Sequence, residues 1–297
     1  MQGRVVIFGG SGFIGRKLTT LLLNNNFVVT VVCSNLKKAF KTLPKHSNLC
    51  VQKVDLFCKD DLTKVIADQD IIINLIGKLH EVQKDDFVRF HTYFASLLAS
   101  LVTNDKKLIH ISALGTEQAA ATSKYAKTKL DGEAAVCNLS QNYVIIRPSL
   151  VFGKGDGFFN LFSKMSQFSP FLPLIGGGKT NFAPVFIEDL AMAILAIINN
   201  WQSYKNTIIQ AAGPQKASFK SILQFILQSK GRKRALITLP FAIANLQAKL
   251  LNLFNIKIIT PDQVELLKYN NLPSDKYLNI DCLIKNPANF KALPCFF

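Results

Sequence analysis

The sequence predicts an α/β fold in which a doubly wound parallel sheet is followed by a small C-terminal lobe. Short apolar runs alternate with helical stretches over the first half of the chain, which is the pattern of a parallel sheet with helices on both faces. The run Ile71-Ile72-Ile73 is apolar at every position, as expected for a strand that is buried on both sides. After Val151 the alternation loosens into glycine-rich segments, which we expect to belong to the lobe.

Seven apolar runs are expected to form strands. They span residues 5–8, 27–33, 49–55, 71–77, 108–113, 143–151 and 207–211. Helical periodicity predicts helices near residues 16–23, 36–43, 60–67, 86–103, 122–140, 189–200, 217–229 and 240–254. Glycine-containing stretches at 153–157 and 173–178 are expected to be loops. We therefore expect a sheet domain of residues 1–150 and about 188–213, and a lobe of about 151–187 and 214–297.

The charge of the chain is strongly positive. Its 297 residues carry a formal net charge of +16, from 35 Lys and Arg against 19 Asp and Glu. Such an excess favours an anionic partner, such as a phosphorylated ligand, a membrane surface or an acidic protein, and a coding bias toward Lys is the alternative explanation. Between residues 190 and 261 there are nine basic side chains and no acidic one. No zinc-finger or aromatic RNA-binding pattern accompanies them, so nucleic acid is not an expected partner.

The six cysteines carry no recognisable metal or redox pattern. No two of them form a CxxC pair, and no His stands at ligand spacing from any of them. We therefore expect no metal site, and we expect reduced thiols in a compartment like the cytosol.

Gly9, Gly12 and Gly15 form a GxxGxxG pattern between the first predicted strand and the first predicted helix. The first glycine permits a tight turn, the second a close approach to a pyrophosphate, and the third close packing of the helix on the strand. The helix N-terminus then offers unpaired N–H groups to the anion. In this βαβ context the pattern predicts a Rossmann-type dinucleotide site, with a purely structural turn as the alternative. The residues of this loop and helix start that are expected to bind the cofactor are Gly9, Gly12, Phe13, Ile14, Gly15 and Arg16.

The end of the second predicted strand lacks an acidic residue. An NAD site usually places Asp or Glu about 20 residues after the glycines, where it binds the ribose 2′-OH, but the first carboxylate of this chain is Asp55. Arg16, Ser34, Lys37 and Lys38 are available for a 2′-phosphate instead. NADP(H) is therefore favoured over NAD(H), and two solvated lysines at a helix start are the alternative.

Further cofactor contacts are expected at the ends of the other strands. Asp55 is either an acceptor for the adenine amine or a cap of the segment that follows it. The small residues after the fourth strand would let a cofactor pass over the edge of the sheet. The remaining residues expected along the cofactor are Leu56, Ile76, Gly77 and Pro148.

Ser112, Tyr125 and Lys129 form a candidate catalytic set. Ser112 ends the fifth predicted strand, and Tyr125 and Lys129 stand four residues apart on a predicted helix, so they share one face of it. A nearby Lys is expected to lower the pKa of the Tyr phenol, which could then exchange a proton with a substrate oxygen while the nicotinamide exchanges hydride. We expect the three residues to line the nicotinamide site, and whether they catalyse turnover stays open. His110, inside a strand, is expected to be packed in the core.

These motifs together resemble the short-chain dehydrogenase/reductase superfamily over residues 1–213. Within it, the resemblance narrows to the atypical NAD(P)H-binding accessory subunit of respiratory complex I and its bacterial relatives. The segments that carry this resemblance are residues 110–115 (HISALG), 147–153 (RPSLVFG), 158–160 (FFN), 172–178 (LPLIGGG) and 262–267 (DQVELL).

The resemblance implies a tightly held NADPH with a structural or assembly role, and contacts with other complex I subunits. It also implies a cytoplasmic location, peripheral on the cytoplasmic face of the inner membrane, or on the matrix side in a mitochondrion. The intact set of Ser112, Tyr125 and Lys129 keeps a second function open, a free-standing NADP-dependent reductase or an epimerase/dehydratase. A redox-sensing regulator that binds NADP(H) and a partner is a third.

The stretch of residues 239–254 reads as an amphipathic helix, with apolar residues at 243, 246, 250 and 253/254. It either faces the core of the lobe or faces a partner or a membrane. The neighbouring Lys and Arg of residues 230–234 suit anionic lipid head groups, so the basic region 216–257 is a candidate contact with a membrane surface.

Overall fold

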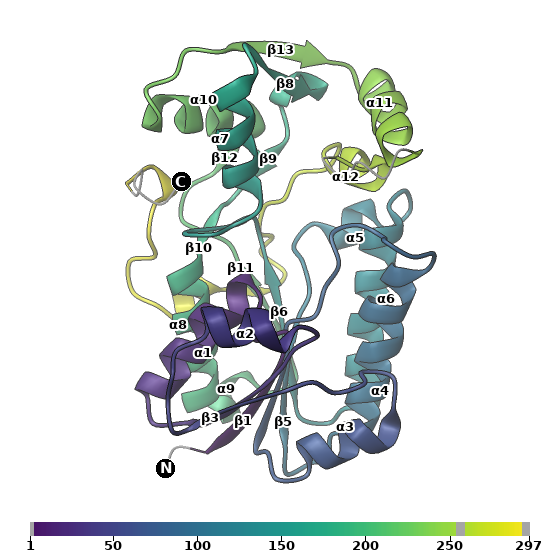
Figure 1. Cartoon of the computed structure of the whole chain (residues 1–297), viewed down its shortest axis with the longest axis vertical. Coiled ribbons are helices and arrows are strands. Elements are labelled where there is room, and N and C mark those ends of the chain that lie inside the picture. The colour runs from purple at the N-terminus through teal and green to yellow at the C-terminus, as the bar shows by residue number, and fades with distance from the viewer. Residues whose placement is uncertain (1–2, 254–258, 293–297) are drawn as a thin grey trace. The chain divides into compact units, whose positions relative to one another are not determined.

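The computed structural model describes residues 3–253 and 259–292, without the side chains of residues 252 and 253 (Figure 1). The described part of the predicted helix 239–254 therefore ends at residue 253, and the end of the basic region 216–257 lies outside the described residues.

The chain forms two compact units. Unit 1 consists of Met1–Ser112, Thr128–Arg147 and Leu190–Ile209, and unit 2 consists of Ala113–Lys127, Pro148–Asp189 and Gln210–Phe297. The domain boundaries expected from the sequence divide the chain differently from these two units, and they stay a prediction.

The predicted α/β fold class is confirmed, because helices pack against an eight-stranded sheet. Its strand order is β14-β11-β6-β5-β4-β1-β2-β3. The strands are β1 (Arg4–Phe8), β2 (Val28–Val32), β3 (Leu49–Gln52), β4 (Ile71–Asn74), β5 (Lys107–Ile111), β6 (Tyr143–Pro148), β11 (Thr207–Ala211) and β14 (Leu278–Asn279). The pairs β1–β2, β2–β3, β1–β4, β4–β5 and β5–β6 are all parallel. Since successive strands run outward from β1 in both directions, the order reverses at β1 and β4, which is where doubly wound sheets bind ligands.

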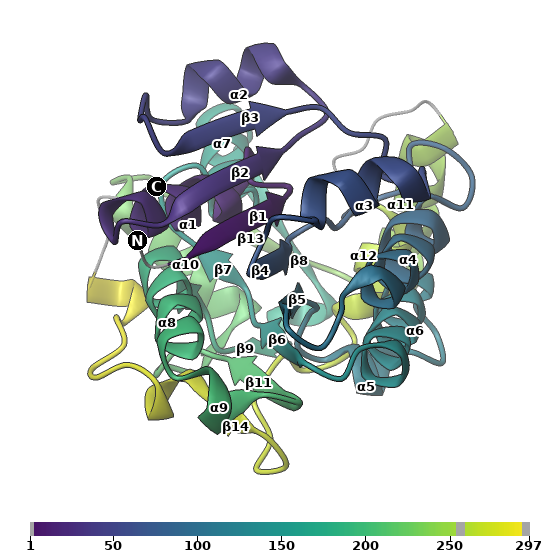
Figure 2. The same ribbon diagram turned by 90° about the horizontal axis from the view of Figure 1, so that it is seen from below.

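Helices cover both faces of this sheet. In Figure 2, α1 and α8 lie on one face and α3, α4 and α6 on the other. The helices of this region are α1 (Phe13–Asn24), α2 (Leu36–Thr42), α3 (Lys59–Ile66), α4 (Phe94–Leu101), α5 (Thr116–Ala119), α6 (Lys124–Leu139), α8 (Ile187–Asn199) and α9 (Trp201–Tyr204). Burial on both faces explains why β1 and β4 are apolar along nearly their whole length.

Unit 2 contains three small two-stranded sheets and several helices. The strand pairs are β7 (Val151–Phe152) with β10 (Val185–Phe186), β9 (Asn181–Phe182) with β12 (Ala217–Ser218), and β8 (Phe171–Ile175) with β13 (Ala235–Leu239). The helices are α7 (Phe158–Phe168), α10 (Phe219–Ser229), α11 (Phe241–Leu253) and α12 (Pro261–Leu266). Phenylalanine rings fill the space between α7 and α10: Phe158 contacts Phe162 and Phe219, with ring centroids 5.0 and 5.9 Å apart.

Two local predictions were wrong. The segment 173–178, expected to be a loop, begins inside β8 and continues as a 3-10 turn at Gly176–Gly178. β8 forms because it pairs in parallel with β13, some sixty residues further along the chain, and Pro173 is tolerated because a two-stranded sheet has only edge strands.

The helix predicted over residues 86–103 is also not continuous. It is a π-helix at Val88–Tyr93 followed by α4. Gly132 of α6 lies against this π-helix, and a Cβ there would meet the carbonyl oxygen of His91 at 2.1 Å. The absence of a side chain at Gly132 therefore permits the close contact between the two helices.

Candidate functional site

The glycine loop joins β1 to α1 by a tight turn. The N–H of Gly9 donates to the carbonyl of Val32 at the end of β2, and the N–H of Gly12 donates to the carbonyl of Gly9, both at 3.0 Å. Gly9 has a φ of 84°, which favours glycine. A Cβ at Gly15 would lie 2.5 Å from the carbonyl oxygen of Gly9 and from Cα of Gly10, so only glycine allows this packing.

The N-terminus of α1 is suited to bind a pyrophosphate. Its N-cap residue is Gly12, no side chain caps the helix, and its first turn contains no acidic residue. The N–H groups of Phe13 and Ile14 belong to this first turn, where a helix leaves its donors unpaired and its dipole favours an anion. Two features fit a bound dinucleotide. A Cβ at Gly15 would fill the space beside the glycine loop, and no side chain caps the N-terminus of α1.

The residues expected at the adenosine ribose follow β2. The bond from Gly9 to Val32 fixes the end of β2 beside the glycine loop, and Ser34 stands two residues further on. Lys37 and Lys38 are exposed in the first turn of α2, whose N-cap Asn35 accepts a hydrogen bond from the N–H of Lys38 at 2.9 Å. The choice between a 2′-phosphate site and a solvated helix start stays a prediction.

Asp55 makes the capping contact that was one of its two expected roles, and its contact with adenine stays a prediction. Its carboxylate accepts a hydrogen bond from the N–H of Phe57 at 3.0 Å, which closes the turn after β3. Leu56 and Ile76 are partly buried against the apolar core of unit 1. Ile76 also faces the glycine loop, since a Cβ at Gly9 would lie 3.4 Å from its Cγ1.

Lys129 and Ser112 lie near the carboxyl ends of β4 and β5. The ammonium of Lys129 donates to the carbonyl of Ile111 at 2.9 Å, and a Cβ at Gly77 would lie 3.4 Å from the same nitrogen. Burial lowers the pKa of Lys129 to about 8, against the opposing effect of the Glu133 carboxylate. The Ser112 hydroxyl is buried and has no hydrogen-bond partner among the described residues. A buried unpaired hydroxyl beside a lysine fits a site that contacts a polar ligand.

Two buried histidines lie in the same region of unit 1. His110 is packed in the core as expected, with its Nδ1 3.1 Å from the Asn74 amide nitrogen. His91 belongs to no motif of the sequence. Its Nε2 accepts from the N–H of Lys78 at 3.0 Å, and its Nδ1 lies 3.0 Å from the Thr128 hydroxyl. It thereby joins the segment after β4 to α6. Nothing in the spacing of the chain indicates this contact, because it depends on the π-helix.

Tyr125 belongs to unit 2 and stands in the first turn of α6, one helical turn before Lys129. Its N–H donates to the carboxylate of Asp262 at 3.2 Å. Burial, together with the negative charge of Asp262, raises the pKa of Tyr125 to about 12. The expectation that this pKa is lowered was therefore wrong, since burial and a carboxylate both oppose the phenolate. Pro148, the last residue of β6, is buried in unit 2.

The parallel sheet with its reversal of strand order, the glycine loop and the uncapped α1 define a dinucleotide-binding α/β protein. The model of the NAD dependent epimerase/dehydratase family matches residues 5–212. Because that match spans more than half of the chain, this protein belongs to the NAD dependent epimerase/dehydratase family.

Curated relatives extend the similarity beyond the family match. A protein of Arabidopsis thaliana named NADH dehydrogenase [ubiquinone] 1 alpha subcomplex subunit 9, mitochondrial, is 28% identical over 98% of this chain and 76% of its own length. A ceramide reductase of Caulobacter vibrioides is 27% identical over 66% of this chain and 61% of its own length.

Solved structures share the fold. A UDP-glucuronic acid 4-epimerase from Bacillus cereus, in complex with UDP-glucuronic acid and NAD, superimposes with a TM-score of 0.67. The superposition covers 80% of this chain and 86% of the epimerase, at 22% sequence identity. At that identity the likeness concerns the fold alone.

Proposed function

We propose that this chain is an NAD(P)H-binding accessory subunit of respiratory complex I, with a role in structure or assembly. The observation that carries this proposal is the length of the similarity. The family match ends at residue 212, whereas the likeness to the Arabidopsis subunit runs along 98% of the chain and so includes most of unit 2. A fold shared with epimerases accounts for residues 5–212, and the remaining similarity supports a common role.

The protonation of Tyr125 supports a role without turnover. With a pKa of about 12, its phenol keeps its proton at neutral pH and acts as a hydrogen-bond donor. A group that shuttles a proton works best when its pKa lies near the operating pH. Tyr125 as described is therefore better suited to hold a bound cofactor than to exchange protons with a substrate.

Each proposed site residue has a binding task. The first turn of α1 after Gly12 would hold the pyrophosphate, and Lys129 would hold the nicotinamide ribose. Ser112 and Tyr125 would donate hydrogen bonds near the nicotinamide, which supplies a transferable hydride when bound. The exposed Lys37, with Lys38, Ser34 and Arg16, would bind a 2′-phosphate, which favours NADP(H) over NAD(H).

We also propose that the chain contacts an anionic membrane surface, and the main observation for this contact is the exposed face of α11. The small residues Ala244 and Ala248 of α11 are buried, while Ile243, Leu246 and Leu250 are more than half exposed. These three stand at i, i+3 and i+7, so they form one apolar face. These exposures disfavour the alternative in which the apolar residues of this helix face the core of the lobe. An apolar face on a helix that also carries the exposed Lys249 suits a membrane interface.

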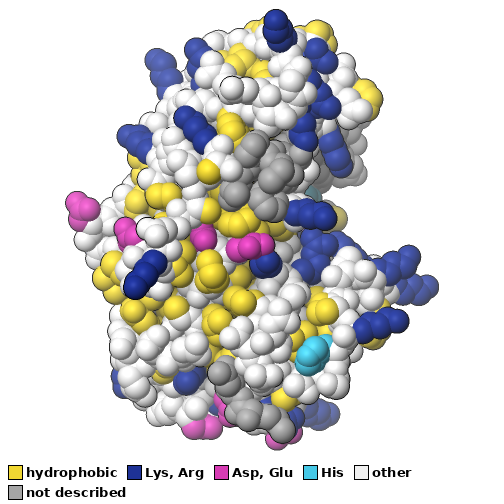
Figure 3. All heavy atoms as spheres, turned by 90° about the vertical axis from the view of Figure 1, so that its left-hand side faces the viewer, with side chains coloured by type: hydrophobic (Ala, Val, Ile, Leu, Met, Phe, Trp, Pro, Cys, Tyr) yellow, Lys and Arg dark blue, Asp and Glu magenta, His cyan; other side chains and the backbone are white. Residues whose placement is uncertain are grey.

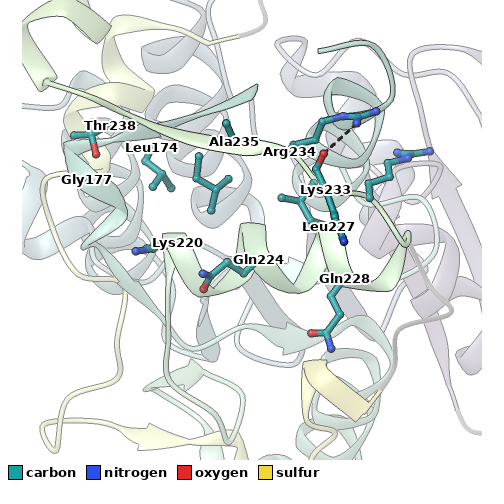
Figure 4. A pocket seen from close by; sticks show the side chains of 12 residues that line it. Leu174, Gly177, Lys220, Gln224, Leu227, Gln228, Lys233, Arg234, Ala235 and Thr238 are labelled. Atoms are coloured by element: carbon teal, nitrogen blue, oxygen red, sulfur yellow. Dashed lines mark hydrogen bonds between the residues drawn. The ribbon is translucent and has the colours of Figure 1, made fainter. Parts of the chain in front are cut away.

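Basic side chains surround a cavity of about 770 Å³ between α10 and β13 (Figure 4). Lys220 and Gln228 lie along α10, and Lys233 leads into β13. Arg232 donates to the carbonyl of Ser163 at 2.7 Å and Arg234 to the carbonyl of Ser166 at 2.8 Å, so part of this charge stabilises the C-terminal half of α7. In Figure 3, Lys and Arg side chains are spread over the face shown, with hydrophobic atoms between them.

The membrane contact that we propose is peripheral. No helix within residues 3–253 and 259–292 is long and apolar enough to cross a bilayer. The basic and apolar surfaces of unit 2 would instead rest on anionic lipid beside the other complex I subunits, on the cytoplasmic or, in a mitochondrion, the matrix side.

Isolation of the native complex tests the proposal. Membranes containing the tagged chain are extracted with a mild detergent, and native mass spectrometry identifies the bound nucleotide and the co-purifying subunits. We expect complex I subunits and stoichiometric NADPH. A chain that elutes alone, with complex I fully assembled in a deletion strain, would contradict the proposal.

A free-standing reductase is the second candidate. The unpaired Ser112 hydroxyl and the presence of Tyr125 and Lys129 favour it, and a relative named ceramide reductase shares 27% identity over 66% of the chain. Its test is NADPH oxidation with a panel of carbonyl compounds, compared with Tyr125→Phe. A reductase requires turnover that Tyr125→Phe abolishes while NADPH binding is retained.

A further inference from the structure

The N-terminus of α6 is capped by a residue that lies far away in the sequence. The carboxylate of Asp262 accepts hydrogen bonds from the N–H of Lys124 at 2.8 Å and from the N–H of Tyr125 at 3.2 Å. It also accepts from the hydroxyl of Ser123 at 3.0 Å. Ser123 in turn accepts from the N–H of Ala126 at 3.1 Å. The first three N–H groups of α6 therefore all have acceptors, and a carboxylate faces the positive end of the helix.

Asp262 is itself held firmly in place. It stands at the second position of α12, which begins with Pro261 and a capping box. In that box the side chain of Thr260 accepts from the N–H of Gln263, and the side chain of Gln263 accepts from the N–H of Thr260. A second bond joins the same segments, because the hydroxyls of Thr122 and Tyr269 lie 3.0 Å apart.

α12 also contacts α11, the helix with the exposed apolar face. The Asn245 amide of α11 donates to the Glu265 carboxylate of α12 at 2.8 Å. Val264, at the centre of α12, is fully buried, as is Ala248 of α11. α12 is thus bonded to α11 through Glu265 and to the first turn of α6 through Asp262.

We propose that Asp262 is a positioning residue for Tyr125, and that α12 links the exposed face of α11 to the turn that carries Tyr125. The proposal rests on the proposed function in that Tyr125 is taken to contact the cofactor and α11 to contact an anionic membrane. The mechanical basis is direct: a carboxylate that accepts bonds from the Ser123 hydroxyl and from the N–H groups of Lys124 and Tyr125 fixes the first turn of α6, and therefore the direction in which the Tyr125 side chain leaves the backbone. A displacement of α12 would release those bonds together.

Amide hydrogen exchange of the full chain without nucleotide tests the positioning role. Asp262→Ala is expected to speed exchange at Lys124 and Tyr125 by about tenfold or more, since both amides lose a charged acceptor. Asp262→Asn keeps the side-chain volume and one acceptor oxygen, so it should restore part of the protection. Asp275→Ala, at an exposed carboxylate of the same unit, is the matched control and should change neither amide.

NADPH titration of the same variants separates this proposal from the proposed function. We expect Asp262→Ala to weaken NADPH binding by about tenfold, with partial rescue by Asp262→Asn and no change for Asp275→Ala. Unchanged exchange at Lys124 and Tyr125 in Asp262→Ala overturns the positioning role. Faster exchange in a protein whose wild type binds no NADPH leaves the positioning role standing and removes the proposed function.

A third variant tests the link to α11. Asn245→Ala breaks the bond to Glu265, and Gln247→Ala, at an exposed position of the same helix, is its control. Asn245→Ala should speed exchange at Lys124 and Tyr125 by less than Asp262→Ala does, whereas Gln247→Ala should leave both amides unchanged. Equal exchange in the two α11 variants overturns the link and leaves Asp262 as a local cap.

Discussion

Arg147 of β6 and Glu133 of α6 form a buried ion pair within unit 1. Their Nη2 and Oε2 atoms are 2.6 Å apart, and the Nε of Arg147 lies 3.0 and 3.1 Å from the two carboxylate oxygens. The two side chains are only 6% and 4% exposed. Glu133 stands one helical turn after Lys129, and its charge raises the pKa of Lys129 against the effect of burial. The pair thus joins the sheet to the helix that carries the proposed cofactor-binding lysine.

Removal of Glu133 should destabilise the protein strongly. Glu133→Ala leaves the buried guanidinium without its carboxylate, which typically lowers the free energy of unfolding by about 3–5 kcal/mol. Urea denaturation measures the loss. The exposed pair of Glu117 and Lys276, 3.7 Å apart, provides a control, since Lys276→Ala should cost about 0–1 kcal/mol. If Glu133→Ala and Lys276→Ala lose equal free energies of unfolding, burial does not explain the contribution of the pair of Arg147 and Glu133 to stability.

Gly15→Ala should abolish dinucleotide binding. A Cβ at this position would lie 2.5 Å from backbone atoms of Gly9 and Gly10, so the loop must open to accommodate it. Fluorescence titration with NADPH should show a loss of affinity of more than about tenfold, the equivalent of 1.4 kcal/mol. Gly157→Ala is the matched control, because a Cβ there meets nothing within 4 Å. Retained affinity in Gly15→Ala would exclude the glycine loop as the pyrophosphate site.

The central strands of the sheet were predictable from the sequence because they are buried on both faces. Ile71–Asn74 is apolar at its first three positions and stands between helical stretches, so local pattern and tertiary environment agree. The glycine loop was predictable for a similar reason, since its function depends on residues that are adjacent in the chain. By contrast, β8 at Phe171–Ile175 was missed because the strand with which it pairs lies some sixty residues away.

The electrostatics of the site could not be predicted in the same way. The spacing of Tyr125 and Lys129 places them on one helix face, but the pKa of the phenol is decided by burial and by Asp262, 137 residues away. Local spacing says nothing about such a contact. The close contact of Gly132 with the carbonyl of His91 in the π-helix likewise joins segments far apart in the chain, and the periodicity of either segment does not indicate it.

Acid should destabilise the protein through His91. Burial, followed by the nearby charge of Lys129, lowers the pKa of His91 from 6.5 to about 3. Because the unfolded state binds the proton more tightly, this contribution to stability is complete above pH 6.5 and is lost as the pH falls toward 3. The maximum slope is about 1.4 kcal/mol per pH unit. Urea denaturation at several pH values measures it, and His91→Gln, which keeps a donor and an acceptor, should reduce the slope between pH 6.5 and 3. His46→Gln, in which an exposed imidazole is lost, should leave it unchanged.

The lysines of α2 should decide the preference for NADP(H). If Lys37 and Lys38 bind the 2′-phosphate, the double change to Ala should weaken NADPH binding by about tenfold and leave NADH binding unaltered. Isothermal titration with both nucleotides measures the ratio. Lys41→Ala, at an exposed position in the last turn of the same helix, is the control for a general loss of positive charge. An equal effect on NADPH and NADH would assign the two lysines to the solvated surface.

The exposed face of α11 should bind anionic membranes. Replacement of Ile243, Leu246 and Leu250 by Ser removes the apolar face, whose burial contributes about 0.8 kcal/mol per CH₂ group. Sedimentation with vesicles of phosphatidylcholine and phosphatidylglycerol should show binding by the wild type that the triple variant loses. Leu139→Ser, at an exposed leucine of α6, is the control for apolar surface in general.

The exposed Lys249 of α11 and the other basic side chains of unit 2 predict how that binding depends on charge. Raised salt should weaken it, because screening acts within about 10 Å at 0.1 M ionic strength. Vesicles of phosphatidylcholine alone should bind much less of the wild-type protein than vesicles that contain phosphatidylglycerol. If the triple variant of α11 binds anionic vesicles as well as the wild type does, the apolar face does not contact lipid, and a protein surface of complex I becomes its expected partner.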